Sequence, residues 1–324
     1  MHLLLTLDAG RAACARALVP QQPFHVGLDF HGVTAVLATN SGYLVEHIRL
    51  GYGYFEAQPA EKPDITVLSL EDGKEHFEAS FVSLLPGRKV QHNVVVPLEG
   101  ELIFLLRDRP SMAYYTTMNL FDGLVVRLRC YYTCLHAATV SSDARAVILC
   151  GAARCGKTSL TANLVARGFD YSADDVTLLE RKGLAVAAFP RAINVREEYQ
   201  ELAPVLLAGA RRIGRFKIAD QERLIVDLGR SAPESVAPSI VCFPRYRPSQ
   251  PTELRRLDEA EALVGLMQNR FHPLSDQLDS NIAADFDTLG RLVERCACYS
   301  LLFSDPMAAS NLIAEHLLES KGAP

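Results

Sequence analysis

The spacing of hydrophobic positions along the chain changes character near residue 130. Before that point, short runs of β-branched and aromatic residues separated by turn-forming residues predict strands. These strands are Phe24–Phe30, Val33–Ala38 and Ile65–Leu70, and the predicted turns are Asn40–Gly42, Glu71–Lys74 and Pro86–Gly87. A helix is predicted over Asn119–Cys130, where Leu120, Leu124, Val125 and Leu128 form one hydrophobic stripe. Residues 1–130 are therefore expected to form a smaller, strand-rich α+β domain.

From Tyr131 onward, strands alternate with helices, which is the pattern of an α/β domain. The predicted strands are Tyr132–Val140, Arg145–Cys150, Tyr171–Glu180, Val186–Phe189, Leu224–Leu228, Ile240–Phe243 and Cys298–Phe303. The predicted helices are Lys157–Arg167, Asp258–Gln268, Ala284–Cys296 and a last helix that begins at Asp305-Pro306. We expect residues 131–324 to form this second domain.

Composition narrows the classes of function. Hydrophobic residues are 49% and charged residues 22%, as in a soluble globular protein. The net charge is −5 and the basic residues are dispersed, so no nucleic acid is expected as a partner. No apolar run reaches the roughly 20 residues that span a bilayer, so no membrane is expected as a partner either. Met1–Leu5 precedes Asp8 without a basic leader, which indicates an early strand and not a signal peptide.

Eight cysteines are scattered along the chain, several of them inside apolar runs. In a chain of this length, that distribution is typical of reduced thiols in a cytoplasmic protein. Cys130 with Cys134, and Cys296 with Cys298, have the spacing of half of a zinc site. No complete four-ligand spacing is present, so buried strand thiols are the favoured interpretation.

The strongest motif is a phosphate-binding loop that matches G-x-x-x-x-G-K-[ST] in full. It comprises Gly151, Ala152, Ala153, Arg154, Cys155, Gly156, Lys157 and Thr158, with Ser159 following in the helix. The glycines allow successive amides to turn towards a phosphate, and the helix presents its positive end to the same anion. Lys157 is expected to reach the β- and γ-phosphates of ATP, and Thr158 to offer its hydroxyl to Mg²⁺.

Two residues of the loop are unusual for this motif. Arg154 either adds charge near the γ-phosphate or lies on the outer face of the loop. Cys155 lies beside a helix N-terminus and is expected to have a lowered pKa. Redox control and a simple filling role are both open for Cys155.

An acidic pair, Asp174 and Asp175, follows Lys157 after one short helix. A strand returning beside the phosphate-loop strand would bring both carboxylates to the phosphates. One carboxylate would help to hold Mg²⁺, and the other would accept the proton of an attacking hydroxyl. Adjacency leaves the two roles interchangeable, and we assign Asp175 to the metal together with Thr158.

His136 lies on the strand that precedes the loop. If that strand pairs with the loop strand through the turn at Ser141–Ala144, His136 lies level with residues 150–152. The imidazole would then be near the phosphates, although a histidine in an apolar strand is more often a core residue.

These segments together resemble the catalytic domain of the bacterial HPr kinase/phosphorylase family. The matching parts in chain order are His136-Ala137, Gly151–Thr158, Arg167-Gly168 and Ala173–Val176, and the clear resemblance spans residues 136–180. It implies a mixed sheet similar to that of phosphoenolpyruvate carboxykinase, with ATP and Mg²⁺ at the strand ends. It further implies transfer of phosphate to a serine hydroxyl with one aspartate as base, and assembly into a homo-oligomer.

Two departures from the family pattern place HPr in doubt as the substrate. The enzymes that act on HPr have an acidic residue shortly after the loop lysine and serine, whereas here Thr158 is followed by Ser159. Their glycine- and arginine-rich signature near the C-terminus is also missing. The chain looks more like divergent HPr-kinase-like proteins associated with peptide modification, some of which phosphorylate lasso-peptide precursors.

The segment Phe189-Pro190-Arg191 is similar to a proline–arginine segment of that divergent group. The resemblance implies that Arg191 neutralises charge in the transition state, and the alternative is a surface arginine. Arg196, Arg245 and Arg270 are weaker candidates of the same kind.

The leading hypothesis is an ATP- and Mg²⁺-dependent kinase that acts on a Ser or Thr hydroxyl of a peptide or small-protein acceptor. Residues 1–130 would help to recognise that acceptor. A kinase for a small metabolite, and a nucleotide-sensing regulator with little turnover, are the alternatives. No residue that would read the nucleotide base is identifiable.

Overall fold

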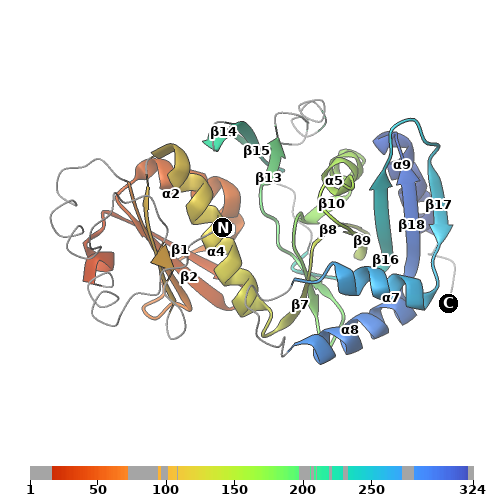
Figure 1. Ribbon diagram of the computed structural model, residues 1–324, viewed down its shortest axis with the longest axis horizontal. Coiled ribbons are helices and arrows are strands. Elements are labelled where there is room, and N and C mark those ends of the chain that lie inside the picture. Colours follow the sequence, from red (N-terminus) through yellow and green to blue (C-terminus); the bar gives the residue numbers. More distant parts are fainter. Residues whose placement is uncertain are drawn as a thin grey trace. The chain divides into compact units, whose positions relative to one another are not determined.

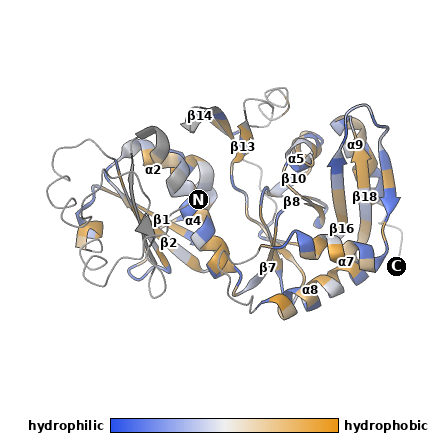
Figure 2. Ribbon diagram, in the orientation of Figure 1, coloured by the Kyte–Doolittle hydropathy of each residue, from blue (hydrophilic) through white to orange (hydrophobic). Residues whose placement is uncertain are grey.

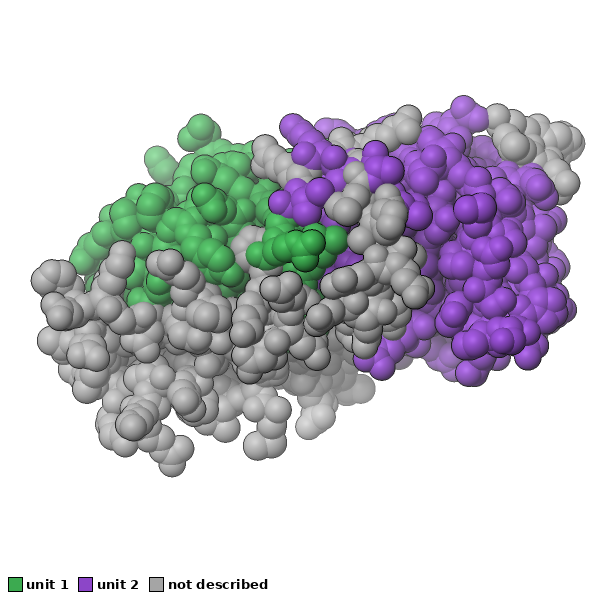
Figure 3. Space-filling view, turned by 90° about the horizontal axis from the view of Figure 1, so that it is seen from above, with its two compact units in different colours: residues 1–127, 214–225 green, residues 128–213, 226–324 purple. Residues whose placement is uncertain are grey.

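The computed structural model describes residues 17–71, 94–95, 101–107, 109–196, 205, 208, 210–218, 221–228, 233–271 and 281–319. The protein is a mixed α/β protein with mixed sheets that divides into two compact units (Figure 3). Unit 1 comprises residues 1–127 and 214–225, and unit 2 comprises residues 128–213 and 226–324. No helix within the described ranges has the length and apolar character needed to cross a membrane.

Unit 1 contains a sheet with strand order β3-β1-β2-β4-β6-β5 (Figure 1). Its strands are β1 (Phe24–Phe30), β2 (Val33–Thr39), β3 (Glu56–Ala57), β4 (Ile65–Glu71), β5 (Val94–Val95) and β6 (Glu101–Arg107). Strands β2, β4 and β6 run parallel, and the other pairs are antiparallel. The three strands predicted from the sequence are confirmed as β1, β2 and β4.

Helices of unit 1 differ from the prediction. The chain turns at Asn40 and Ser41 as predicted, but helix α2 (Gly42–Tyr52), with Ser41 at its N-cap position, follows where no helix was predicted. Leu44 and Ile48 of α2 are fully buried, and this helical spacing explains the element. Helix α4 (Arg109–Leu128) contains the predicted stripe but begins ten residues before the predicted Asn119. The predicted strand at Met1–Leu5 and the turn at Pro86–Gly87 lie outside the described residues, as do Asp72–Lys74 of the turn predicted at Glu71–Lys74.

Unit 2 is built around a sheet that has two arms sharing one strand, β16. One arm has the order β10-β8-β9-β16 and continues through β18 to β17, and the other has the order β16-β12-β11-β7. The strands are β7 (Tyr132–Leu135), β8 (Ala137–Ser142), β9 (Arg145–Cys150), β10 (Asp170–Ala173), β11 (Thr177–Glu180), β12 (Val186–Ala187), β16 (Ser235–Tyr246), β17 (Glu253–Arg256) and β18 (Ala297–Phe303). Strand β13 (Ile193–Arg196) also belongs to unit 2, whereas most of β14 (Arg212–Ile218) and β15 (Gln221–Asp227), which pair with each other, belongs to unit 1.

The helices of unit 2 begin and end close to their predicted limits. They are α5 (Lys157–Ala166), α7 (Glu259–Gln268), α8 (Ile282–Arg295) and α9 (Pro306–Glu319). Asp258 and Glu261 form a capping box at the start of α7, and Asp305 accepts a 2.8 Å hydrogen bond from the Met307 amide at the start of α9. The capping groups therefore confirm the predicted starts of α7 and α9.

Two predicted strands of unit 2 are each divided into two, and each chain segment changes arm at the division. Tyr132–Val140 is broken at His136 into β7 and β8, and Tyr171–Glu180 is broken at Asp174–Val176 into β10 and β11. The peptide N–H of His136 leaves the sheet ladder and donates to the Asn269 carbonyl at 2.7 Å. Asp175 has a φ of 71°, which interrupts an extended strand. The single-strand predictions are therefore wrong at these two places.

Two buried threonines connect the divided segments. The Thr139 and Thr177 hydroxyl oxygens are 2.8 Å apart, and Thr177 donates to the Ala137 carbonyl at 3.2 Å. Because the hydroxyl of Thr177 has one hydrogen, Thr139 is the donor in the bond between the two threonines. Both side chains are fully buried, where an unmade hydrogen bond would cost about 1–3 kcal/mol. These hydrogen bonds fix the positions at which the two chain segments pass from one arm of the sheet to the other.

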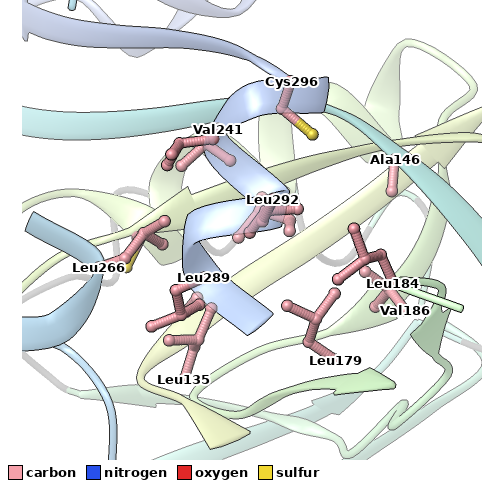
Figure 4. Close-up of a cluster of buried hydrophobic side chains, with 14 of the residues drawn as sticks. Leu135, Ala146, Leu179, Leu184, Val186, Val241, Leu266, Leu289, Leu292 and Cys296 are labelled. Carbon is pink, nitrogen blue, oxygen red and sulfur yellow. The ribbon is translucent and has the colours of Figure 1, made fainter. Parts of the chain in front are cut away.

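A hydrophobic cluster joins helices α7 and α8 to the sheet (Figure 4). Leu289 and Leu292 of α8 are fully buried and lie among residues of both arms, including Leu135 and Val241. The opposite face of α8 carries charged residues, and Figure 2 shows the two kinds of residue alternating along the helix. This core holds the two arms of the sheet in place beneath the loop ends that carry the candidate site.

Replacement of Leu292 by Ala should lower the free energy of unfolding of unit 2 by about 2–5 kcal/mol, because it leaves a cavity in this cluster. Phe286→Ala on the same helix is the matched control, since the Phe286 side chain is 56% exposed, and its effect should stay within about 0.5 kcal/mol. Denaturant unfolding followed by circular dichroism measures both. Equal losses for the two variants would contradict the assignment of the core.

Candidate active site

The phosphate-binding loop connects β9 to α5, as its strand–loop–helix setting predicts. Gly156, directly before α5, has a φ of 102°, and an added Cβ would lie 2.4 Å from Cζ of Phe303. Both the backbone conformation and the available space therefore require glycine at this position. An added Cβ at Gly151 would lie 2.9 Å from the Cys155 sulfur, so the loop is also tightly closed at its start.

Lys157 is directed back over the loop. Its ammonium group donates to the carbonyls of Gly151 at 2.6 Å and Ala152 at 3.1 Å, and the residue is 6% exposed. The positive charge is thus held against the first turn of the loop. This position suits an ammonium group that exchanges loop carbonyls for phosphate oxygens.

Thr158 contacts one member of the acidic pair. Its hydroxyl donates to the two Asp174 carboxylate oxygens at 3.2 and 3.5 Å. Asp174 is 6% exposed, whereas Asp175 is exposed and has left-handed backbone angles. The sequence assigned Asp175 to the metal beside Thr158, and the geometry instead brings Asp174 to Thr158.

The route by which the carboxylates reach the loop differs from the sequence prediction. Strand β10 pairs with β8, and β8 lies between β10 and the loop strand β9. The acidic strand is therefore not the immediate neighbour of the loop strand. Ala173 forms a parallel bridge with Phe189, whose N–H donates to Ser172 at 2.7 Å, so the chain before Arg191 runs beside the end of β10.

Burial, and to a smaller extent the neighbouring Asp175 carboxylate, raise the pKa of Asp174 to about 7. Lys157, the Thr158 hydroxyl and Arg191 act in the opposite direction. The carboxylate of Asp174 therefore lies in surroundings that disfavour its charge until another cation is close. A carboxylate and a hydroxyl are hard oxygen donors of the kind that Mg²⁺ prefers, so the pair fits that ion.

His136 lies where the β-ladder register predicts. Ala137 pairs with Cys150, which sets His136 level with Gly151. Burial lowers the pKa of His136 below 6.5, Lys157 lowers it further, and Asp175 opposes the shift. The surroundings of the half-buried imidazole therefore favour its uncharged form. Its ring centroid lies 6.1 Å from that of Phe271.

Tyr171 connects Arg191 to the acidic pair. The Tyr171 hydroxyl donates to the Arg191 carbonyl at 2.6 Å, and the tyrosine ring is 2% exposed. Arg191 is half-buried and close enough to favour the charged form of Asp174. Sequence reasoning missed Tyr171 and Phe271. An aromatic hydroxyl inside a buried strand just before two acids was the available signal for Tyr171, because such a hydroxyl usually has a partner.

The structure bears differently on the two unusual loop residues, Cys155 and Arg154. Burial raises the pKa of the Cys155 thiol, which outweighs the lowering effects of Lys157 and nearby amides. The expectation of a lowered pKa at Cys155 is therefore wrong, because desolvation is larger than the effect of the helix terminus. Arg154 is exposed with a φ of 66°, and Ala152 and Ala153 are also exposed.

Arg270 is buried and contacts an acidic residue of α8. It forms an ion pair with Asp285 at 3.3 Å, and Arg181 approaches the same carboxylate at 3.4 Å. Thr133 donates to Asp285 at 2.8 Å. Arg270 thus has a buried carboxylate partner, and its role towards phosphate charge stays a prediction. Arg245 is exposed at the end of β16, and the side chain of Arg196 lies outside the described residues.

The cysteine pairs with zinc-like spacing are not brought together as a metal site. Cys134, Cys296 and Cys298 are buried, and Cys130 is exposed after α4. In the described part of the chain, no group of three or more His, Cys, Asp or Glu side chains is arranged to hold a metal ion. Burial raises the pKa of Cys134 to about 12, as expected for an inert thiol.

Comparison with known proteins agrees with the motifs. No family model matches the chain. HPr kinase/phosphorylase of Chlorobium phaeovibrioides (strain DSM 265 / 1930) is 24% identical over 133 residues, which is 40% of this chain and 39% of the relative. The chain is similar to HPr kinase/phosphorylase. The resemblance inferred from the sequence is thereby confirmed, over about two fifths of the relative's length.

Among solved structures, the HPr(Ser) kinase/phosphatase from Coxiella burnetii also matches part of the chain. It is 14% identical, and the match covers 58% of this chain and 93% of that chain with a TM-score of 0.28.

The surroundings of Asp174 predict a specific pH dependence of stability. Its folded pKa of about 7 lies above the unfolded value of 3.8, so the folded state binds the extra proton between these pH values. Stability should fall as the pH rises from about 4 to 7, and the Asp174→Asn variant should not show this loss. The variant should then be more stable than the native protein at pH 8 by a few kcal/mol, because the folded and unfolded pKa values of Asp174 differ by about three.

Thermal unfolding without added Mg²⁺, from pH 4.5 to pH 8, measures this difference. Asp287→Asn is the control, because Asp287 lies on α8 with its side chain 71% exposed and does not act on the pKa of Asp174. A gap between native protein and Asp174→Asn that is the same at both ends of the pH range would refute the linkage.

Proposed function

We propose that this protein is an ATP- and Mg²⁺-dependent kinase that transfers the γ-phosphate to a serine or threonine hydroxyl of a peptide or small protein. The observation that carries the proposal is the Thr158 hydroxyl on the buried Asp174 carboxylate, beside Lys157 in the phosphate-binding loop. Next to this group, the Asp175 carboxylate interacts electrostatically with the imidazole of His136. The similarity to HPr kinase/phosphorylase supports the same type of reaction.

Each residue has a distinct role in this proposal. Loop amides and the N-terminus of α5 bind the phosphates, and Lys157 leaves the Gly151 carbonyl to contact the β- and γ-phosphates. Thr158 and Asp174 hold Mg²⁺, which when bound supplies positive charge that offsets the phosphate oxygens. We thus assign the metal to Asp174 and leave Asp175 for the chemistry of the acceptor.

Asp175 is the proposed base. The acceptor oxygen attacks the γ-phosphorus, the bond to the β–γ bridging oxygen breaks, ADP leaves, and the hydroxyl proton passes to Asp175. The exposure of Asp175 gives an acceptor direct access to its carboxylate. Neutral His136 orients the acceptor hydroxyl or accepts its proton in turn, and Arg191 offsets charge that develops on the transferred group.

The nature of the acceptor follows from two features. The name of the Chlorobium relative points to a protein substrate, and Ser159 replaces the acidic residue that the HPr-directed enzymes carry there. We infer a peptide or small protein other than HPr, recognised with the help of unit 1. Cytoplasmic location and assembly into a homo-oligomer belong to the same proposal, and every cysteine in the described part of the chain is a free thiol.

Mass spectrometry of peptides encoded beside the gene, incubated with the protein, ATP and Mg²⁺, tests this function. We expect a gain of phosphate on a serine or threonine. Lys157→Ala and Asp175→Asn should each reduce the rate by at least about a hundredfold, because they remove phosphate binding and the base. Asp287→Asn is a matched control, since Asp287 lies on α8 with its side chain 71% exposed, and should leave the rate unchanged.

Other outcomes separate the alternatives. Phosphate transfer to small hydroxyl compounds but to no peptide would show that the acceptor is a small metabolite. Nucleotide binding without turnover on any acceptor would favour the regulator. If Asp175→Asn keeps full activity and Asp174→Asn loses activity, then Asp174 is the base and the assignment of the two aspartates is reversed.

A further inference from the structure

The carboxyl ends of three parallel strands lie along one edge of the unit 2 sheet. Strands β9, β16 and β18 are neighbours in this order and run parallel (Figure 1). The acidic pair approaches the loop from the β8 and β10 side of β9. The ends of β16 and β18 therefore lie on the opposite side of the loop. In open α/β sheets, ligands bind outside the carboxyl ends of the strands, so this side is available for the rest of a nucleotide.

Tyr246, the last residue of β16, is anchored directly to the loop. Its backbone N–H donates to the Cys155 carbonyl at 3.1 Å, one residue before Gly156. The side chain is nevertheless 45% exposed, which places it among the most exposed large aromatic residues described. The neighbours Arg245 and Arg247 are exposed as well, so the segment is basic as well as aromatic.

The ring of Tyr246 rests on a rigid support. Its centroid lies 5.7 Å from that of Phe303, with the planes at 69°, in an edge-to-face contact. Phe303 is fully buried, and its ring fills the space in which Gly156 would otherwise carry a side chain. Tyr246 and Phe303 also occupy paired positions in the β16–β18 ladder. The buried Phe303 ring therefore lies between the start of α5 and the exposed Tyr246 ring.

We propose that Tyr246 is the platform on which the base of the bound nucleotide stacks. This inference rests on the proposed nucleotide-binding function and adds the part of the site that contacts the base. An aromatic face stacks on any base without reading its hydrogen-bonding edge. The platform accordingly accepts adenine and guanine alike, which accounts for the lack of a base-reading residue in the sequence.

Isothermal titration calorimetry with Mg²⁺ and two ligands, ATP and inorganic tripolyphosphate, tests the inference, because tripolyphosphate has no base. Tyr246→Ala should weaken ATP binding about tenfold or more and leave tripolyphosphate binding unchanged. Tyr246→Phe keeps the aromatic face and should retain ATP affinity. Tyr131→Ala is the matched control, because Tyr131 is 66% exposed after α4, and should bind both ligands normally.

The remaining outcomes are distinguishable. If Tyr246→Ala binds ATP as the native protein does, or loses both ligands equally, the stacking inference is overturned while nucleotide binding stands. If the native protein binds neither ligand, the proposed function fails and the inference falls with it. Loss of both ligands in Lys157→Ala shows that the two compounds report on the phosphate-binding loop.

Discussion

A pair of buried hydroxyl groups, on Thr139 and Thr177, sets the geometry on which the candidate site depends. Thr139 pairs with Ala173, directly before the acidic bend, and Thr177 follows that bend. Thr177 also pairs with Leu135 and donates to Ala137, so it holds the chain on both sides of His136. One short hydrogen-bonded contact therefore fixes both places at which a strand leaves one arm of the sheet for the other.

The polar residues of the candidate site lie at these two strand breaks. A regular strand would place alternate side chains on opposite faces and leave no room for adjacent polar groups to converge. The interruptions release Asp174 and His136 from this alternation. The register of β8 with β9 sets His136 level with the loop, and Asp174 meets the loop through the Thr158 hydroxyl. The loop contributes Lys157 from the same edge. Functional polar groups thus occupy the points at which regular pairing fails, while the hydrophobic cluster beneath supplies the stability.

The sequence predicted those features that depend on residues close together in the chain. The loop, the start of α5 and the acidic pair follow from residue type and spacing. The breaks at His136 and at Asp174–Val176 were not predictable, because apolar residues continue on both sides and the change of arm depends on distant partners such as Asn269. Helix α2 was missed because Ser41 signals a turn and a helix start equally well. Which aspartate meets Thr158 likewise required the three-dimensional register.

The proton that Asp174 retains near neutrality has a consequence for how the site would be filled. A divalent ion settling against that carboxylate must displace the proton into the surrounding solution. Under the proposed function, loading the protein with its metal–nucleotide complex is then an exchange of ions, favoured in alkaline and opposed in acidic surroundings. Occupancy would follow the acidity of the surroundings as well as the supply of nucleotide, through a single side chain that is buried from solvent.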